Sequence, residues 1–235
     1  MARILLYNCK VIHIQYMQQY ENYSFDLWLT LIRSNPAFKQ ARAQYIYEQH
    51  NPMKATVSQI ADIIRRVDLS CNHANEVCGR NISHREMYSM VLYQIAYTNH
   101  TAAVIDKLCD DVEQLFLTYP PEIYSEDTIQ TLRTLKYDGR RILLLSNTGF
   151  IPGDTISKWM QTTDFAFIFN HRYYSDRIGY SKPNPKAFNE LKYVGMGSLC
   201  HVGDNPVADY AGAIHAGFDA FLINSNDKTI KDMLL

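Results

Sequence analysis

Five polar residues that lie far apart in the sequence could act together as one reactive site: Asp26, Ser146, Lys182, Asp204 and Asp209. Asp26, Ser146 and Asp204 each directly follow a short apolar run, which is typical of a buried strand. A carboxylate can act as a covalent nucleophile, and paired carboxylates bind hard divalent cations through oxygen. An ammonium offsets the charge of a bound anion. The set therefore suits an aspartyl nucleophile that attacks a phosphorylated substrate held by a divalent cation.

The segments that must position these residues alternate between strand-like and helix-like patterns in the second half of the chain. Strand-like runs cover residues 141–145, 165–169, 199–202 and 219–223. A helical pattern covers 154–161, and two further helices are expected after Asn184-Pro185 and Asn205-Pro206, where Asn serves as N-cap and Pro as first helical residue. This alternation predicts an α/β fold with a doubly wound parallel sheet. Ligands bind at the carboxyl ends of the strands in such sheets, where Asp26, Ser146 and Asp204 fall.

A different pattern, helical throughout, separates the first strand from the rest of the sheet. Apolar residues at helical spacing cover 36–50, 56–67, 85–96 and 102–117. We therefore predict a helical cap domain at 34–124, inserted into a core made of 1–33 and 125–235 and lying over the strand ends. Residues 1–16 have no evident role before the first strand and are interpreted as an unstructured or non-native extension, with Met17 as a possible start.

Composition narrows the class of protein. Of 235 residues, 47% are hydrophobic and 20% charged, which is enough apolar material for a packed core. The net charge of −1 gives no sign of a nucleic-acid or anionic-membrane partner, and no apolar run reaches the ~18 residues of a membrane span. Five scattered cysteines, an odd count, indicate reduced thiols and a cytoplasmic location. The sequence carries no signal for an oligomeric state.

Taken in order, four segments resemble the motifs of the haloacid dehalogenase-like hydrolase superfamily. They are Asp26-Leu-Trp28-Leu-Thr30, the apolar strand that ends in Ser146, Gly179-Tyr-Ser-Lys182-Pro183, and Gly203-Asp204 followed by Asp209. The order and strand context of the segments are more specific than any one of them. The position of the helical insertion is similar to that in members with a cap after the first motif.

The resemblance implies a Rossmann-like core and a Mg²⁺-dependent phosphatase that acts on a small phosphorylated metabolite through an aspartyl-phosphate. Asp26 would be the nucleophile, and Asp26 and Asp204 would hold Mg²⁺. Asp209 would bind the metal through water or orient Lys182. Phosphate oxygens would accept hydrogen bonds from the Ser146 hydroxyl and the amides of Asn147 and Thr148, while Lys182 would offset their charge.

Trp28 departs from the family pattern. In the family's phosphatases an acid at this position protonates the leaving group, which an indole cannot do, and losing a general acid costs ~10²–10⁴ in rate. Three interpretations stay open: a weak or leaving-group-restricted phosphatase, a 2-haloacid dehalogenase, whose halide leaves without a proton, and a non-catalytic ligand-binding member. The complete set of metal acids favours the first. We expect Trp28 to pack under the cap hinge and shape the substrate pocket.

The substrate itself must be selected by the cap, where the sequence offers several cations. Lys39, Lys54 and the pair Arg65-Arg66 lie within the predicted helical insertion. Because charged residues are mostly exposed, we expect these four side chains to be solvated.

Overall fold

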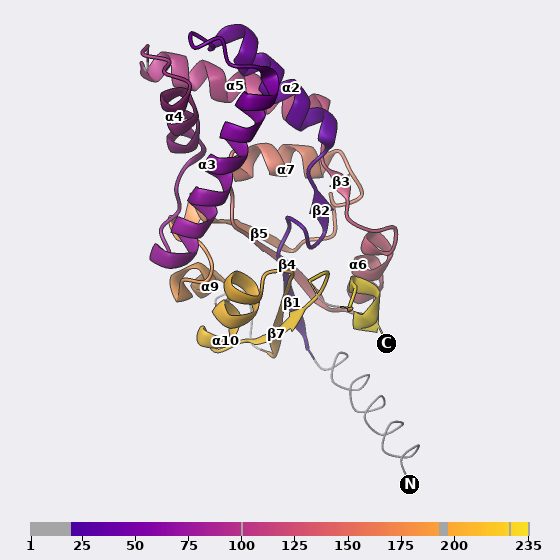
Figure 1. Cartoon of the computed structure of the whole chain (residues 1–235). Helices are drawn as coiled ribbons and strands as arrows, with labels where there is room; N and C mark the ends of the chain where they lie inside the picture. Colours follow the sequence, from indigo (N-terminus) through magenta and orange to yellow (C-terminus); the bar gives the residue numbers. More distant parts are fainter. Residues whose placement is uncertain (1–19, 100, 193–196, 226, 235) are drawn as a thin grey trace.

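The computed structural model describes residues 20–99, 101–192, 197–225 and 227–234, so the predicted extension at 1–16 and Met17 lie outside the described part. The chain forms a core built on a parallel sheet and a helical layer above one edge of that sheet (Figure 1). The sheet order is β5-β4-β1-β6-β7. Its strands are β1 (Asn22–Phe25), β4 (Arg141–Ser146), β5 (His171–Tyr174), β6 (Leu199–Gly203) and β7 (Asp219–Leu222).

Helices cover both faces of this sheet, which explains why its central strands read as unbroken apolar runs. In β4, Ile142 and Leu144 pack with one hydrophobic cluster, whereas Leu143 and Leu145 pack with another. The first cluster includes side chains of α6 (Asp127–Tyr137), α7 (Gly153–Gln161) and η2 (Ile230–Leu234). The second includes side chains of α9 (Pro185–Lys192) and α10 (Gly212–His215). Two short helical segments complete the core, α8 (Ser175–Ile178) and η1 (Pro206–Ala211).

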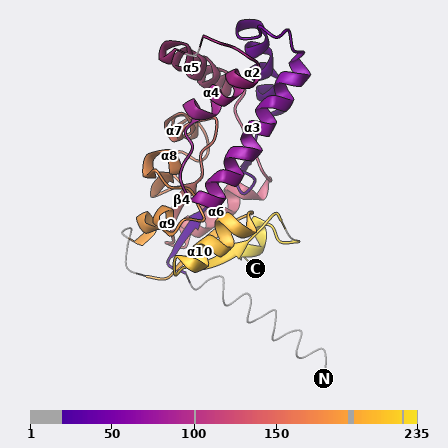
Figure 2. The ribbon, with the colours of Figure 1, turned by 60° about the vertical axis from the view of Figure 1, so that its left-hand side comes forward.

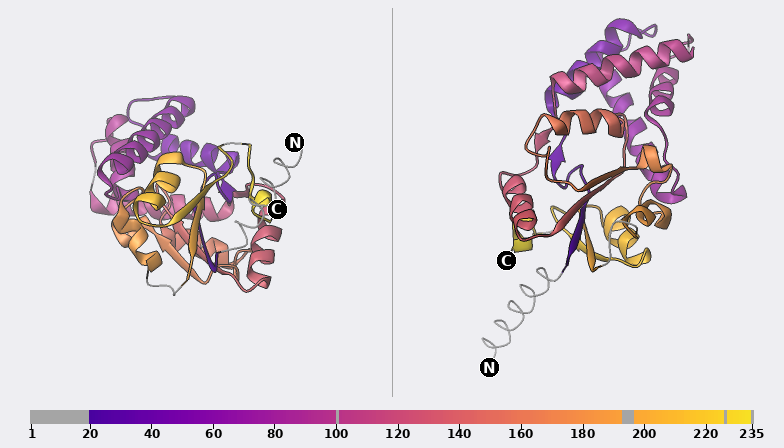
Figure 3. Two further views of the ribbon diagram at one scale, coloured as in Figure 1. Left: turned by 90° about the horizontal axis from the view of Figure 1, so that it is seen from below. Right: turned by 180° about the vertical axis from the view of Figure 1, so that it is seen from behind.

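The inserted layer, called the cap below, consists of helices with clear start signals. They are α2 (Pro36–Gln49), α3 (Val57–Cys78), α4 (His84–Gln94) and α5 (Ala102–Thr118). Their N-cap residues Asn35, Thr56, Ser83 and Thr101 each accept a backbone N–H from the first turn of the helix. Figures 2 and 3 show the cap standing on the core at the carboxyl ends of the strands, with α3 descending toward α9 and α10.

The chain enters and leaves the cap through one two-stranded antiparallel connection. In it, β2 (Ile32–Arg33) pairs with β3 (Glu122–Ile123). Arg33 Nε lies 2.9 Å from a carboxylate oxygen of Glu122 across this pair. The predicted boundaries at residues 34 and 124 fall directly beside it.

The structure differs from the expected elements at two places. The strand predicted at 165–169 is wrong: residues 165–168 form turns, and the strand is β5, His171–Tyr174. Phe165, Ile168 and Phe169 are buried against the sheet as loop residues, so their apolar run reflects core packing without a strand. The helix expected at 56–67 continues to Cys78 and ends at Gly79, which has a φ of 67°. Among the described helices none combines the length and apolar character that crossing a membrane requires.

Candidate active site

Three of the predicted site residues meet at the carboxyl edge of the sheet because their strands are neighbours. Asp26 follows β1, Ser146 ends β4, and Asp204 follows β6. The strands β4 and β6 flank β1 in parallel, and the Asp26 amide donates to the Val202 carbonyl at 2.8 Å. The sheet therefore places a buried carboxylate, 7% exposed, between the two other strand ends.

Lys182 reaches the same point from the loop before α9. Its Nζ donates to Asp26 Oδ1 at 2.7 Å, to Asp209 Oδ1 at 2.6 Å and to the Leu145 carbonyl at 2.7 Å. The three N–H groups of the ammonium thus all have acceptors. The side chain of Asn147 holds the lysine backbone, since its Oδ1 accepts the Lys182 amide at 2.8 Å and its Nδ2 donates to the Lys182 carbonyl at 3.0 Å.

Asp26, Asp204 and Asp209 form a cluster in which one carboxylate oxygen of each lies within 4.8 Å of the others. The Thr30 hydroxyl lies between two of them, 3.2 Å from Asp26 Oδ2 and 3.1 Å from Asp204 Oδ1. Oxygen ligands at such spacing fit a hard divalent cation. Asp209 has the least coordinating capacity left, because Lys182, His201 and the Asn205 amide all contact its oxygens, whereas Asp26 has one partner on each oxygen and Asp204 contacts the Thr30 hydroxyl.

Asp209 is packed behind Lys182 and is almost fully buried. Its Oδ2 accepts the Asn205 amide at 3.0 Å, and its Oδ1 lies 3.3 Å from His201 Nε2. Gly203 makes room for this carboxylate, because a Cβ at that position would lie 2.2 Å from Asp209 Oδ2. The glycine of the Gly203-Asp204 motif is therefore required for steric reasons, because a larger residue would displace the Asp209 carboxylate.

Burial and charge shift the pKa values of these groups in opposite directions. Burial raises the pKa of Asp26 to about 7, assisted by Asp209 and Asp204 and opposed by Lys182. Burial and Asp209 likewise raise the pKa of Asp204 to about 6. For Asp209 burial acts upward too, but the Lys182 ammonium and the His201 hydrogen bond outweigh it and hold the pKa below its usual range. A divalent cation beside Asp26 and Asp204 would stabilise both as carboxylates.

Two predicted phosphate donors have other partners in this structure. The Thr148 amide, predicted to bind phosphate, donates instead to Ser175 Oγ at 2.8 Å, and the Thr148 side chain is buried. This corrects the prediction for Thr148: the Ser175 side chain takes the donor away from the site. The Ser146 hydroxyl is buried and donates to the Asn147 carbonyl at 3.2 Å. Asn147 lies on the cavity wall as expected.

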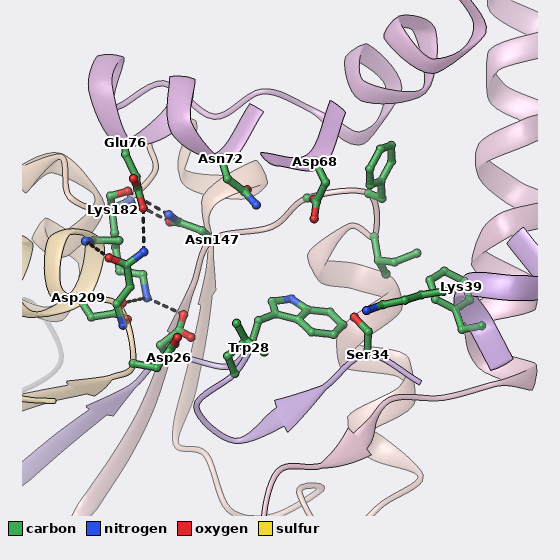
Figure 4. Close-up of a pocket in the computed structure, with 18 of the residues that line it drawn as sticks. Asp26, Trp28, Ser34, Lys39, Asp68, Asn72, Glu76, Asn147, Lys182 and Asp209 are labelled. Carbon is green, nitrogen blue, oxygen red and sulfur yellow. Dashed lines mark hydrogen bonds and ion pairs between the residues drawn. The ribbon is translucent and has the colours of Figure 1, made fainter. Parts of the chain in front are cut away.

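A cavity of about 380 Å³, called the catalytic cavity below, opens between the strand ends and the cap. Its floor includes Asp26, Lys182, Asp204 and Asp209. Trp28 lies on its wall, partly buried and edge-on to Phe116 of α5 with ring centroids 6.4 Å apart (Figure 4). The expectation that Trp28 packs below the cap and shapes the pocket agrees with this placement.

The cap wall of the catalytic cavity contains residues that the sequence interpretation missed. One helix face of α3 presents Asp68, Asn72 and Glu76 at intervals of four residues (Figure 4). From α2 come Phe38, Lys39 and Arg42. The four-residue spacing was a usable signal on α3. Lys39 was expected to be solvated, and it is exposed yet lines the cavity.

The cap also contacts the core through a second connection, called the latch below. The Asn81 amide donates to the Gly179 carbonyl at 3.2 Å, and the Ser181 amide donates to the Gly79 carbonyl at 3.1 Å. Nearby, Asn205 Nδ2 donates to Glu76 Oε1 at 2.8 Å. The segment after α3 is thus hydrogen-bonded to the loop that carries Lys182.

Comparison with known proteins supports this architecture. No protein-family model matches the chain. It is 34% identical over 104 residues to the glyceraldehyde 3-phosphate phosphatase of Methanothermobacter thermautotrophicus, a match that spans 42% of this chain and only 44% of that protein.

Solved structures match most of the chain. YfnB of Bacillus subtilis, described as a HAD-hydrolase and bound to magnesium, has a TM-score of 0.68 at 17% identity, covering 89% of this chain and 91% of that one. A 2-haloacid dehalogenase of Pseudomonas syringae has a TM-score of 0.58 at 22% identity, covering 88% and 87%. A HAD phosphatase of Thermococcus onnurineus has a TM-score of 0.58 at 19% identity, with the same coverage. These matches confirm the predicted α/β fold class.

Proposed function

We propose that this chain, whose fold is that of the haloacid dehalogenase-like hydrolases, is a Mg²⁺-dependent phosphatase that hydrolyses a small phosphorylated metabolite through an aspartyl-phosphate on Asp26. One observation carries the proposal. The Asp26 carboxylate is buried at a strand end, 2.7 Å from the Lys182 ammonium and clustered with Asp204 and Asp209. Structural carboxylates rarely gather in this way at the floor of a cavity, whereas phosphoryl-transfer sites need such a cluster.

The nucleophile is held in place from two sides. Lys182 contacts Asp26 Oδ1, and the Thr30 hydroxyl lies 3.2 Å from Oδ2, so the plane of the carboxylate is fixed before substrate enters. Asp26 attacks phosphorus, the bond from phosphorus to the leaving oxygen breaks, and the phosphoryl group remains on Asp26 until water displaces it. Lys182 and the Asn147 amide are the groups placed to stabilise charge on the phosphoryl oxygens.

Asp26 and Asp204 would hold the Mg²⁺ ion, which supplies positive charge next to the phosphoryl oxygens. Asp209 serves a different purpose in this proposal, because its oxygens are used by Lys182, His201 and the Asn205 amide. It positions the ammonium and keeps it protonated: burial alone would lower the pKa of Lys182, but Asp209 and Asp26 raise it.

Trp28 sets the limit of this activity. Its indole N–H can donate a hydrogen bond but cannot give up a proton to a departing alkoxide. Leaving groups that need little protonation should therefore react faster than simple alkoxides. A 2-haloacid dehalogenase is the second candidate. Trp28 puts an aromatic side chain where a phosphatase needs an acid, and a halide leaves without a proton. The intact pair Asp204 and Asp209 favours the metal-dependent phosphatase, and a non-catalytic role would leave this whole cluster without a purpose.

The test is hydrolysis of p-nitrophenyl phosphate with Mg²⁺ and with chelator, alongside halide release from 2-chloropropionate. We expect Mg²⁺-dependent phosphate release that is lost in Asp26→Asn. Asp127→Asn is the matched control, because it removes a surface acid of α6 outside the cavity. Halide release that chelator does not affect would refute the proposal in favour of the dehalogenase. Phosphate affinity without any turnover would point to a non-catalytic protein.

A further inference from the structure

The α2 wall of the catalytic cavity carries two cations that the proposed chemistry does not use. Lys39 and Arg42 are three residues apart on this helix, so they share one face, and both line the cavity. Figure 4 draws Trp28 between Asp26 and Lys39, which places the lysine beyond the indole as seen from the nucleophile. The catalytic cavity therefore has a carboxylate cluster with Lys182 at its floor and two further cations on its α2 side.

Arg42 is fixed in orientation by aromatic rings. Its guanidinium carbon lies 5.0 Å from the ring centroid of Phe38 and 4.7 Å from that of Phe150. Its Nε is buried and has no hydrogen-bond partner. Because the two rings contact the guanidinium, a hydrogen-bond acceptor approaches along its planar edge. The N–H groups of that edge match the two oxygens of a carboxylate or phosphate.

The charge of these two side chains is not neutralised by an ion pair. Arg33, Arg80, Arg85, Arg133 and Arg177 each pair with a carboxylate. Within the described ranges no carboxylate lies within 4.0 Å of Arg42 or Lys39. Asp68 faces the same cavity, and burial raises its pKa although Arg42 and Lys39 act to lower it. Glu76 also lines the cavity, but it accepts a hydrogen bond from Asn205 and lies near Lys182, away from Lys39 (Figure 4). Asp68 is therefore the cavity carboxyl group that acts against Lys39 and Arg42.

We propose that the substrate of this site bears a second anionic group, a carboxylate or a second phosphate, which Arg42 and Lys39 bind while the scissile phosphate occupies the floor at Asp26. This inference rests on the proposed function. The cavity of about 380 Å³ is at the small end of the ~300–1,000 Å³ typical of ligand pockets, so the ligand is a short-chain metabolite. The preferred substrate class is therefore a phosphorylated short-chain acid or a short bisphosphate.

Matched substrates separate this recognition from leaving-group chemistry. Glyceraldehyde 3-phosphate and 3-phosphoglycerate both release a primary alkoxide. They differ at carbon 1, which is an aldehyde in the first and a carboxylate in the second. Propane-1,3-diol bisphosphate, compared with its monophosphate, tests a second phosphate as the anionic group. We expect kcat/KM to be about 10- to 100-fold higher for at least one substrate that carries the second anionic group, 3-phosphoglycerate or the bisphosphate, than for its control; this is the worth of one or two hydrogen bonds to a charged group.

The Arg42→Met variant keeps an unbranched side chain between the two rings and removes the charge. It should lower kcat/KM for the preferred substrate by about 10- to 100-fold, chiefly through KM, and change kcat/KM for glyceraldehyde 3-phosphate by less than about threefold. Lys39→Met should act in the same direction. The control is Arg66→Met on the exposed face of α3, which should leave kcat/KM unchanged for both the preferred substrate and glyceraldehyde 3-phosphate. Rescue by Arg42→Lys should be partial, because the ammonium lacks the planar fork.

Binding can be followed without turnover. The protein has two tryptophans, Trp28 and Trp159, and only Trp28 lines the cavity, so intrinsic fluorescence reports ligand entry. In an Asp26→Asn background with Mg²⁺, 3-phosphoglycerate or the bisphosphate should bind at least tenfold more tightly than glyceraldehyde 3-phosphate, and Arg42→Met should abolish the difference.

The two proposals fail in different ways. If p-nitrophenyl phosphate and every phosphate above resist Mg²⁺-dependent hydrolysis, the proposed function is wrong, and the fluorescence titration still decides the anion site. The inference is overturned, and the proposed function stands, if an active phosphatase hydrolyses 3-phosphoglycerate and the bisphosphate no better than their controls. The same holds if Arg42→Met lowers kcat/KM equally for all of these substrates.

Discussion

In the proposed phosphatase, replacing Trp28 with aspartate should supply a proton donor at the position of the indole. The backbone around this position is well fixed: the Leu29 amide donates to the Ile32 carbonyl at 2.7 Å, and the Ile32 amide donates to the Leu27 carbonyl at 3.0 Å. An aspartate at position 28 would therefore start from the place where the indole now enters the cavity. A general acid contributes ~10²–10⁴ in rate, so alkyl phosphates should be hydrolysed faster by a factor within that range.

The same substitution has a cost in stability. It removes the edge-on contact of Trp28 with Phe116, which is worth about 0.5–1.5 kcal/mol beyond burial. Because Trp28 is only partly buried, the total loss should stay below the ~3–5 kcal/mol of a fully buried tryptophan. The variant should remain folded at room temperature, which urea denaturation followed by circular dichroism can establish.

The assay compares an alkyl phosphate with p-nitrophenyl phosphate in wild type, Trp28→Asp and Trp28→Asn. The asparagine variant opens the same space without supplying a proton, so it isolates the carboxyl group from the change in shape. We expect Trp28→Asp to gain mainly on the alkyl phosphate, because p-nitrophenolate leaves with little protonation. A folded Trp28→Asp that is no faster than Trp28→Asn on the alkyl phosphate would refute our account of the missing acid.

Three further outcomes can be checked in the purified protein. Burial raises the pKa of Asp26 from 3.8 to about 7, so protonated Asp26 stabilises the metal-free fold at low pH, and this stabilisation is lost as pH rises through 7. Differential scanning fluorimetry should therefore show that Mg²⁺ raises Tm more at pH 8 than at pH 5.5. An equal rise in Tm at both pH values would contradict this expectation. Asp209→Asn leaves Lys182 with one fewer carboxylate in a buried site and should lower the free energy of unfolding, measured by urea denaturation, by about 3–5 kcal/mol. Asp127→Asn, at a half-exposed surface ion pair, should lower it by less than about 1 kcal/mol. Leu29 has a φ of 62° and is 55% exposed, so Leu29→Gly should raise the free energy of unfolding by up to about 1 kcal/mol; a lower Tm would show that the leucine side chain compensates for its backbone strain.

Local signals made much of the core predictable. The apolar runs before Asp26, Ser146 and Asp204 and the Asn-Pro helix starts depend on residues within a few positions, and burial on both faces of the sheet leaves a pattern that can be read directly. The interpretation failed where a longer-range partner decides the outcome. The Thr148 amide donates to the Ser175 side chain, 27 residues later in the sequence, and the residues around Thr148 do not indicate this contact.

The cap wall illustrates the same limit from the other side. Lys39 and Arg42 could be placed on one helix face from their spacing, but which way that face points depends on how α2 packs against α3 and α5. A surface lysine and a cavity lysine look alike in sequence: Lys39 lies between Phe38 and Gln40, a setting that an exposed helix lysine can share. Only the aromatic partners Phe38 and Phe150, one of them more than a hundred residues away, distinguish Arg42 from an ordinary solvated arginine.

The latch between the cap and the Lys182 loop has a consequence for when the site is competent. Residues of α3 line the cap side of the catalytic cavity, and any motion that lifts α3 away from the core must break the hydrogen bonds donated by the Asn81 and Ser181 amides. The loop released by that motion is the one that delivers Lys182 to Asp26. Such a motion would therefore remove one backbone restraint from the loop whose lysine contacts Asp26. Amide hydrogen exchange at Asn81 and Ser181 would follow that motion, because both amides would lose their acceptors when the cap lifts.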